Sequence, residues 1–481
     1  MPLKPTTKAQ VDGHRFLARR ARHALVARDV RMLHDPLRRQ SLGLTVGAVA
    51  AVLGCAGAAI LALLDPAPDV GRSSVMVAKD SGEMYVRAGD AVHPVFNLAS
   101  ARLVLGEPAE PVTVRDRDLA GTRRGGLLGI PGAPSALPAP RDDAGVAAVS
   151  WTVCDAVADA ERGRPRIAST SIVARDGGAG PGRPTGADEI VLAVQEGDGW
   201  LLRGGTRARI DLADDALLTI LGLGAVDPRP VSAALLDPLA EVAPVARPEI
   251  ELVGAPVDYG LDGIRIGQVF TVDTVSGPRT YVALADGVQE VGPVVADLIR
   301  STSTVGAVVS VAPDRMDVPR SVALDVAAFP TERPTVLGAA DSPVLCVRDA
   351  ADEGTAVRRV ALVAGAPEPG PDQARPVAGS DGGGPAVDAV GIPGGGLLVA
   401  AASRGTSTRS AVTTVVSDTG VRFDVPDADT AAVLGVGGTP VTVDAGTLDR
   451  LPAGPRLDRA SALVSRDGTD LAVAGGGATG R

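Results

Sequence analysis

Lysine, histidine and aromatic residues are scarce in this chain of 481 residues. Aromatic residues make up 2% of it, and the lysines are Lys4, Lys8 and Lys79. A Walker loop, which binds nucleotide phosphates, requires a lysine followed by serine or threonine. None of the three lysines has such a neighbour, so the sequence contains no Walker loop.

Histidine is too sparse for the usual catalytic and metal sites. Of the 4 histidines, only His93 lies beyond the first 41 residues. A zinc site of histidine and cysteine ligands cannot be assembled from one histidine. No G-x-S-x-G motif accompanies it as the nucleophile of a serine triad. We interpret His93, which precedes Pro94, as a surface residue.

Glycine-rich and acidic clusters offer no further site. No Lys-Ser/Thr pair follows the glycine runs at residues 222–224, 394–396 and 475–477, so they do not open a phosphate loop. The acidic clusters at residues 211–215 and 427–429 lack the spacing of a calcium loop, and helix N-caps account for them. The sequence therefore predicts no catalytic, cofactor-binding or metal-ligating residue.

One long hydrophobic run is present at residues 42–64, where 23 consecutive positions carry no charge. At 1.5 Å of rise per residue, a helix of this length spans about 34 Å and crosses a hydrocarbon core of about 30 Å. A secretory signal peptide is the alternative, but the basic region before the run is too long for one and no clear A-x-A cleavage site follows. We expect a retained membrane anchor.

The charges around this run indicate its orientation. Residues 1–41 contain ten Lys or Arg against three Asp, whereas Asp65 and Asp69 follow the run. The positive-inside rule places the N-terminus in the cytoplasm and the rest of the chain outside. That larger part holds 37 basic and 54 acidic side chains, and this acidic balance argues against nucleic acid as a partner.

Residues 11–36 have the pattern of a basic amphipathic helix. Phe16, Leu17 and Leu25 recur at helical spacing among arginines, and Pro36 is expected to stop the helix. Such a helix either lies on anionic lipid headgroups or docks on another cytoplasmic protein. The pattern does not distinguish these two roles.

Cysteine usage predicts one disulfide. Of the 3 cysteines, Cys55 lies in the hydrophobic run, which leaves Cys154 and Cys346 in the exported part. Both lie in strand-like apolar runs and face an oxidising compartment. We expect them to pair and to join segments 192 positions apart. The alternative is two separately buried free thiols.

The exported part contains an internal repeat of a hairpin, a short helix and a proline-bearing exit. Apolar residues alternate on both sides of a glycine turn in four predicted hairpins, whose turns contain Gly82, Gly204, Gly277 and Gly420. Three of them are followed by a stretch, at residues 99–112, 214–231 and 429–441, in which we expect a short amphipathic helix that ends at glycine with proline just beyond. The third repeat departs from this pattern, because its helix at residues 294–300 lacks the glycine.

Two strand-rich segments lie outside the repeats and contain the two exported cysteines. We expect residues 141–194 and 336–364 to pair into one central domain built from discontinuous sequence. The stretches at residues 177–186 and 366–396 are rich in glycine and proline, which is typical of loops and linkers.

Several motifs resemble the EccB family, the single-span membrane component of the type VII (ESX) secretion system in high-GC Gram-positive bacteria. They are TTKAQVDGHRF at residues 6–16, the Arg19-Arg20 pair, ALVARDVRML at 24–33, Asp35-Pro36, WTVCD at 151–155 and YVALADGVQEV at 281–291. The resemblance covers nearly the whole chain, and the Gly-rich tail after Leu457 departs from it. It implies four small repeat domains around a central β domain, with approximate internal twofold symmetry.

The expected fold class is α+β and β-rich, with a single transmembrane helix and an elongated extracytoplasmic body. The expected divisions are a cytoplasmic helix at 1–41, the transmembrane helix at 42–64, repeat domain 1 at 65–138, the first segment of the central domain at 139–196, repeat domain 2 at 197–256, repeat domain 3 at 257–335, the second segment of the central domain at 336–386, repeat domain 4 at 387–456 and a flexible tail at 457–481.

Two functions are considered. The resemblance implies a structural subunit of the type VII secretion machinery in the inner membrane, with its body in the periplasm. The alternative is an ATPase, because members of the family have been described as ATPases, although no Walker motif is present. A glycan-binding module is a weaker third possibility. Glycan-binding grooves usually expose aromatic rings, and only 2% of this chain is aromatic.

The resemblance also implies partners. They are the other membrane components of type VII secretion, namely its FtsK/SpoIIIE-like ATPase, its multi-span subunit and the mycosin protease. We expect an oligomer within that complex, and no cofactor.

We predict that a cytoplasmic reporter fused near Thr6 and an export-dependent reporter fused at the C-terminus are both active, because the positive charge precedes the span. Neutralising Arg38 and Arg39 should weaken this orientation and leave the exported body intact. Reporter activities in the reverse pattern would contradict the orientation.

Overall fold

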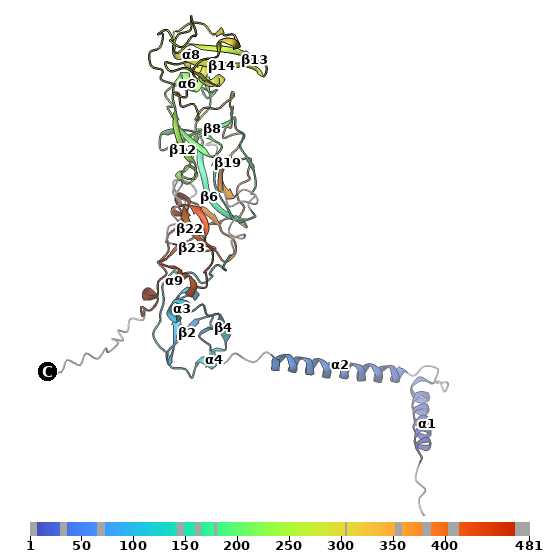
Figure 1. The fold of residues 1–481 in the computed structure, drawn as a ribbon. Coiled ribbons are helices and arrows are strands. Elements are labelled where there is room, and N and C mark those ends of the chain that lie inside the picture. The colour runs from blue at the N-terminus through green and yellow to red at the C-terminus, as the bar shows by residue number, and fades with distance from the viewer. Residues whose placement is uncertain are drawn as a thin grey trace, which may run out of the picture. The chain divides into compact units, whose positions relative to one another are not determined.

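The structure is a computed structural model. It describes residues 7–28, 36–64, 73–141, 149–158, 165–177, 180–303, 305–351, 358–377, 386–402 and 413–466. The chain divides into two compact units, Met1–Asp69 and Val70–Arg481, and each is described by itself. Figure 1 shows the helices of the first unit and the strands of the second.

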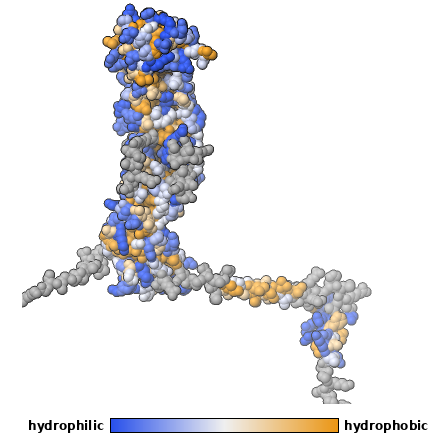
Figure 2. All heavy atoms as spheres, viewed as in Figure 1, coloured by the Kyte–Doolittle hydropathy of each residue, from blue (hydrophilic) through white to orange (hydrophobic). Residues whose placement is uncertain are grey.

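The first unit consists of two helices, α1 (Lys8–Ala27) and α2 (Pro36–Leu64). The Gln10 side chain accepts the Thr7 backbone N–H at 3.0 Å and caps the start of α1. Hydrophilic and hydrophobic residues lie on different sides of α1 (Figure 2). The predicted stop at Pro36 is wrong: α1 ends at Ala27, and Pro36 is the first residue of α2, where its missing N–H costs nothing.

Four sheets among the described residues of the second unit share one topology. Three consecutive antiparallel strands are followed by a helix, and a fourth strand then returns parallel to the first. We call them repeats 1 to 4. Their strands are β1 (Val75–Ala78), β2 (Met84–Ala88), β3 (Ala91–Val95) and β4 (Pro111–Val114); β8 (Glu189–Gln195), β9 (Asp198–Arg203), β10 (Thr206–Ile210) and β11 (Arg229–Pro230); β13 (Val269–Thr274), β14 (Gly277–Ala283), β15 (Val288–Glu290) and β16 (Val309–Ser310); and β22 (Leu397–Ala402), β23 (Thr413–Val416), β24 (Arg422–Val425) and β25 (Val441–Asp444).

A helix before each fourth strand forms where the sequence predicts one, and in repeats 1, 2 and 4 it ends just before the predicted glycine. These helices are α3 (Leu98–Leu105), α6 (Asp215–Ile220), α8 (Pro293–Thr302) and α9 (Ala428–Val433). Gly106, Gly222 and Gly435 follow α3, α6 and α9 with φ of 81°, 74° and 69°, a left-handed conformation that favours glycine. As expected, α8 ends without glycine, at Thr302, and Ser303 is its C-cap.

All four predicted hairpins form, but they are not equivalent. The hairpins at Gly82 and Gly277 join the first and second strands of repeats 1 and 3, whereas those at Gly204 and Gly420 join the second and third strands of repeats 2 and 4. Each repeat has three antiparallel strands and therefore two hairpins, and apolar alternation marks either one. The predicted two-stranded unit thus missed one antiparallel strand and the returning fourth strand in every repeat.

Repeats 1 and 3 share a further feature that aligns them. Arg124 lies over the ring of Tyr85 at 4.7 Å, and Arg320 lies over Tyr281 at 5.1 Å. The two residues are 39 positions apart in both repeats, and both arginines form a parallel bridge with the third strand. Repeat 1 therefore corresponds to repeat 3, which leaves repeats 2 and 4 as the second pair.

The fifth sheet of the described residues is the central sheet, built from discontinuous sequence as expected. Its strands run in the order β20, β21, β6, β5, β18, β19, β7. They are β5 (Val149–Ala158), β6 (Arg166–Asp176), β7 (Arg183–Pro184), β18 (Val344–Ala351), β19 (Arg358–Ala364), β20 (Arg375–Pro376) and β21 (Ala389–Gly391). The remaining elements are α4 (Asp116–Leu119), α7 (Ala233–Leu236), β12 (Ala240–Val245), η1 (Pro313–Arg315), β17 (Thr335–Val336), α10 (Ala445–Asp449) and α11 (Arg459–Ala462).

Three buried cores join these sheets in a fixed order. One contains side chains of repeats 1 and 4, another those of repeats 2 and 3, and the third those of the central sheet with repeats 2 and 4. The sheets therefore follow one another as repeat 1, repeat 4, central sheet, repeat 2 and repeat 3, which the colours of the second unit in Figure 1 also show.

Strand pairing departs from the expected domain division at three points. β8 lies in the expected central segment 139–196 but pairs within repeat 2, and β21 lies in expected repeat domain 4 but pairs with β6 of the central sheet. The start of the expected flexible tail is packed: Leu457 and Ala462 are fully buried, and Ser465 pairs with Leu128 of repeat 1. An apolar strand fits either sheet, and its partner is remote in sequence. Residues 467–481 lie outside the described residues.

A buried arginine connects repeats 1 and 4. Arg102 of α3 is 6% exposed, and its Nη1 donates to the carbonyl of Leu434, which follows α9, at 2.6 Å. Its Nε donates to the Ala109 carbonyl at 3.1 Å, and its Nη2 pairs with Glu110 at 2.9 Å. The guanidinium thus satisfies an end carbonyl of α9 that the helix cannot.

We predict that Arg102→Met lowers the free energy of unfolding by about 1–3 kcal/mol, because buried carbonyls of both repeats lose their donor. The matched control is Arg117→Met in repeat 1, where the side chain is 73% exposed and its removal should change stability by less than about 0.5 kcal/mol. Chemical unfolding curves of the three proteins measure both effects. Equal stability of the two variants would contradict the role of Arg102.

Candidate functional site

The structure brings the two predicted site cysteines together in the middle of the central sheet. Cys154 on β5 and Cys346 on β18 are directly opposed in an antiparallel pair, and their Cα atoms are 4.0 Å apart. They form a disulfide, with Cys154 5% exposed and Cys346 fully buried. The bond therefore joins the two halves of the discontinuous sheet at their contact.

A buried carboxylate lies next to this disulfide. Asp155 is fully buried, and its Oδ1 accepts the hydroxyls of Thr170 and Ser232, both at 2.8 Å. Its Oδ2 accepts the backbone N–H of Ser232 at 2.7 Å. Ser232 in turn caps α7 of repeat 2 through the N–H of Leu235. Asp155 therefore fastens the start of α7 to β5.

A buried arginine completes this polar cluster. Arg229 of β11 is 2% exposed, and it donates to the carbonyls of Ser342, Pro343 and Asp155. These carbonyls lie just before β18, which begins at Val344, and within β5. Asp155, Ser232 and Arg229 together tie repeat 2 to both central strands of the sheet.

Burial shifts the pKa of both charged groups against ionisation. Burial raises the pKa of Asp155, although hydrogen bonds from Ser232 and Thr170 and the charge of Arg229 partly offset the rise. Burial lowers the pKa of Arg229 to about 10, and the nearby Asp155 charge opposes that change. Arg229 remains protonated at neutral pH, so it supplies a positive charge to the cluster.

Sequence reasoning missed this cluster, although one signal was available. Asp155 directly follows Cys154 in an apolar strand, and a carboxylate in such a strand requires buried donors. Its partners Ser232 and Arg229 lie more than 70 positions away, and a single sequence does not connect them.

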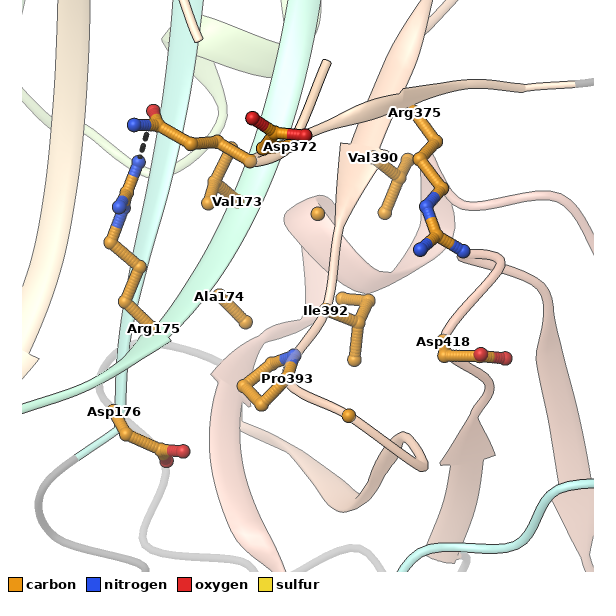
Figure 3. A pocket seen from close by; sticks show the side chains of 13 residues that line it. Val173, Ala174, Arg175, Asp176, Asp372, Arg375, Val390, Ile392, Pro393 and Asp418 are labelled. Carbon is orange, nitrogen blue, oxygen red and sulfur yellow. Dashed lines mark hydrogen bonds between the residues drawn. The ribbon is translucent and has the colours of Figure 1, made fainter. Parts of the chain in front are cut away.

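A cavity lies between the central sheet and repeat 4 (Figure 3). It has a volume of about 570 Å³, and strand β6, the segment around β20 and β21, and Asp418 of repeat 4 line it. Val173, Ala174, Val390, Ile392 and Pro393 form its apolar part. The charged groups are Arg175, Asp176, Asp372, Arg375 and Asp418.

The cavity carries no recognisable catalytic arrangement. Arg175 donates to Gln373 at 2.8 Å, and Asp176 pairs with Arg141 at 2.6 Å, so two of its charged groups are engaged by the protein itself. Its lining contains no histidine, cysteine, serine or lysine. A mixed-charge recess of this kind can bind a polar segment, and its lining lacks hydroxyl, thiol and amine nucleophiles.

The other residues considered as site candidates from the sequence, His93 and Lys79, do not line the cavity. His93 is half-buried rather than a surface residue: its Nδ1 lies 3.0 Å from the Gly126 carbonyl, and its ring packs against Gly125. Lys79 is exposed at the turn between β1 and β2. Among the described residues, no group of three or more His, Cys, Asp or Glu could hold a metal ion.

The apolar helix of the first unit is long enough to cross a membrane. Residues Leu42–Ile60 of α2 have a mean hydropathy of 2.0, and none of this stretch is buried by the protein. An exposed apolar helix of this length requires a lipid environment or partner helices.

Comparison with known proteins decides the family. A family model described as "Type VII secretion system ESX-1, transport TM domain B" matches residues 3–471. The chain belongs to the EccB family. This finding confirms the resemblance drawn from the sequence motifs.

Curated EccB proteins resemble the chain over nearly their whole length. The ESX-1 secretion system ATPase EccB1 of Mycolicibacterium smegmatis (strain MKD8) is 36% identical over 478 residues, which cover 96% of this chain and 95% of that protein. The ESX-3 secretion system ATPase EccB3 of M. smegmatis (strain ATCC 700084 / mc(2)155) is 34% identical, with 96% and 91% covered. Both names describe an ATPase.

Solved EccB structures have the same fold. A chain of an intact ESX-5 inner membrane complex, a composite C3 model, matches with a TM-score of 0.71 and 32% identity over 97% of both chains. The EccB3 dimer of the ESX-3 core complex matches with a TM-score of 0.71 and 31% identity over 82% of this chain and all of that one. Relatives of this chain therefore occur as a dimer and within inner membrane complexes.

We predict that the stability difference between the wild type and Asp155→Asn depends on pH. Because the folded pKa of Asp155 is raised, its contribution to stability is complete below the ordinary value of about 4 and is lost as pH rises toward the folded pKa. As pH increases from about 4, the free energy of unfolding of the wild type should therefore fall relative to that of Asp155→Asn, whose side chain does not ionise.

Unfolding free energies measured across pH test this dependence. Asp116→Asn is the control with the opposite slope, since backbone N–H donation from Asp80 lowers the pKa of Asp116 and stabilises the ionised form. A pH-independent difference between the wild type and Asp155→Asn would contradict the assignment.

Proposed function

We propose that this chain is a structural subunit of a type VII (ESX) secretion machinery, anchored in the cell membrane by α2 and assembled through its second unit. The observation that carries the proposal is its similarity, over 97% of both chains, to a subunit of an intact ESX-5 inner membrane complex. The second unit supports it, because its repeats share continuous cores around a central sheet and no serine, cysteine, histidine or lysine lines their cavity.

The proposal includes topology and partners. The basic residues before α2 favour a cytoplasmic N-terminus and a periplasmic second unit. The partners are the other membrane components of the same system, namely its FtsK/SpoIIIE-like ATPase, its multi-span subunit and the mycosin protease. We also propose the domain division given above, with β8 moved to repeat 2, β21 to the central sheet and residues 457–466 to repeat 1.

An ATPase is the second candidate, since the names of the relatives favour it. Phosphoryl transfer depends on positive groups and usually Mg²⁺ placed around the γ-phosphate. The cavity between the central sheet and repeat 4 combines two arginines with three aspartates, and no lysine lines it. These charges do not suit a triphosphate, so the chemistry of the site favours the structural role.

Extraction of the tagged protein in a gentle detergent tests the structural role. We predict that the other membrane components of the secretion system remain bound. Recovery of the protein alone, under conditions that preserve other membrane complexes, would contradict the proposal.

We further predict that ATP hydrolysis in such a preparation fades as the protein is purified from the motor subunit. Lys79→Ala should leave any residual rate unchanged, because Lys79 lies at an exposed turn remote from the cavity lining. Turnover that follows the protein through successive columns and falls in a point variant of the cavity, such as Arg375→Ala, would support the ATPase instead.

A further inference from the structure

The outer strand of repeat 3 is an unprotected sheet edge. β16 pairs only with β13 and ends the sheet, which runs β15, β14, β13, β16. Val308 and Val309 are 39% and 37% exposed, and the whole stretch 306–310 is exposed. Sheet edges of this kind present unpaired backbone groups to other chains.

The register shows which backbone groups are available. Val309 is opposite Phe270, Ser310 is opposite Thr271, and the N–H of Val311 donates to the Thr271 carbonyl. Residues 309 and 311 therefore direct their backbone groups toward β13. Since these groups alternate along a strand, the N–H and C=O of Val308 and Ser310 point away from the sheet, where no described residue accepts or donates.

The corresponding edges of the other repeats carry features that block pairing. Pro111 begins β4 of repeat 1 and follows Glu110, β11 of repeat 2 consists of Arg229 and Pro230, and β25 of repeat 4 follows Pro440 and ends at Asp444. Charges and prolines on an outer strand prevent edge-to-edge association. Residues 305–311 read VGAVVSV and contain neither.

An apolar turn lies beside the same edge. Leu252 and Val253 are 67% and 46% exposed, and Leu252 has a φ of 57°, which is unusual for leucine. Val253 packs against Gly267, and the neighbouring Gln268 donates its amide to the Ala307 carbonyl at 3.2 Å. Hydrophobic residues are visible on this end of the second unit in Figure 2.

We propose that β16 pairs with β16 of a second copy of this chain. A twofold antiparallel pair centred on Val309 places Val308 opposite Ser310 of the second copy, and the reverse, so that the outward N–H and C=O groups of both residues are satisfied. This edge can pair with the same edge of a second copy because its side chains are uncharged and small, so two copies meet without like-charge repulsion. A relative of the chain forms a dimer, which makes a second copy the natural occupant.

This contact is one of at least two between copies. Pairing of so short an edge buries far less than the roughly 1,200 Å² of a stable protein interface, so it requires copies that a larger contact already holds together. The inference therefore rests on the proposed function, because the assembled machinery supplies that contact.

Cysteine cross-linking in the intact membrane complex tests the pairing. In a Cys55→Ala background, Val309→Cys would place two cysteines directly opposite each other, which is the arrangement that Cys154 and Cys346 adopt within the chain. We expect mild oxidation of membranes with copper phenanthroline to give a disulfide-linked dimer that reduction reverses.

Two variants serve as controls. Val112→Cys lies at the equivalent register position of repeat 1, opposite Met76, next to Pro111, and should give no dimer. Adding Ser310→Pro to Val309→Cys removes an N–H that does not bind β13, so the fold is kept and the cross-link should be lost.

The outcomes separate this inference from the proposed function. If the other membrane components co-purify with Val309→Cys but no dimer forms, or the cross-link joins a different polypeptide, the pairing is wrong and the structural role stands. A cross-link that persists with Ser310→Pro also overturns the pairing. If no component co-purifies with the wild type, the proposed function itself fails.

Discussion

The pairing of β5 with β18 is the contact on which the rest of the second unit depends. Cys154 and Cys346 lie opposite each other at this contact, and the sheet continues outward through β6 on one side and β19 on the other. On the neighbouring outer strands, Ser171 pairs with Cys154 and Val363 pairs with Cys346, so the two halves are related by an approximate twofold axis at the disulfide. Repeats 2 and 4 pack on this sheet, and repeats 1 and 3 pack on them.

The polar cluster breaks this approximate symmetry. Asp155 follows Cys154, whereas Val347, a buried hydrophobic residue, follows Cys346. Repeat 2 is therefore attached to the central strands through Asp155, Ser232 and Arg229, and the other half has no carboxylate at the matching position. A buried ionisable cluster is expensive unless every donor and acceptor is paired. The Nε of Arg229 is buried without a hydrogen-bond partner among the described residues, so the contacts of the cluster fix where repeat 2 sits on the sheet but carry a desolvation cost.

Local sequence predicted the elements whose signals are local. The apolar run of α2, the turn glycines Gly82 and Gly277 and the glycine that ends α3 each act within a few residues, and all were predicted. Strand membership could not be predicted in the same way, because β8 and β21 are short apolar strands that suit two sheets equally. The same distinction holds for the site. The disulfide could be predicted because only two cysteines lie in the exported part, whereas the partners of Asp155 are remote in sequence and could be identified only from the structure.

The dependence on contacts remote in sequence also explains two wrong predictions, the end of the first helix at Pro36 and the start of the tail at residue 457. Proline both stops and starts helices, so Pro36 could be placed correctly only with the start of α2 in view. Residues 457–466 look like a tail because glycine surrounds them, yet Leu457 and Ala462 fill the core of repeats 1 and 4. In both cases the deciding contact involves residues distant in sequence.

The most direct test of this account is the state of the three cysteines in the mature protein. The protein is unfolded in denaturant without reductant, alkylated, and analysed by peptide mass spectrometry. We predict that only Cys55 is labelled before reduction and that Cys154 and Cys346 become labelled after it. Loss of this cross-link over a loop of 192 residues should cost on the order of 5 kcal/mol in the chain-entropy model. Labelling of all three cysteines before reduction would contradict a body organised around the β5 and β18 pair.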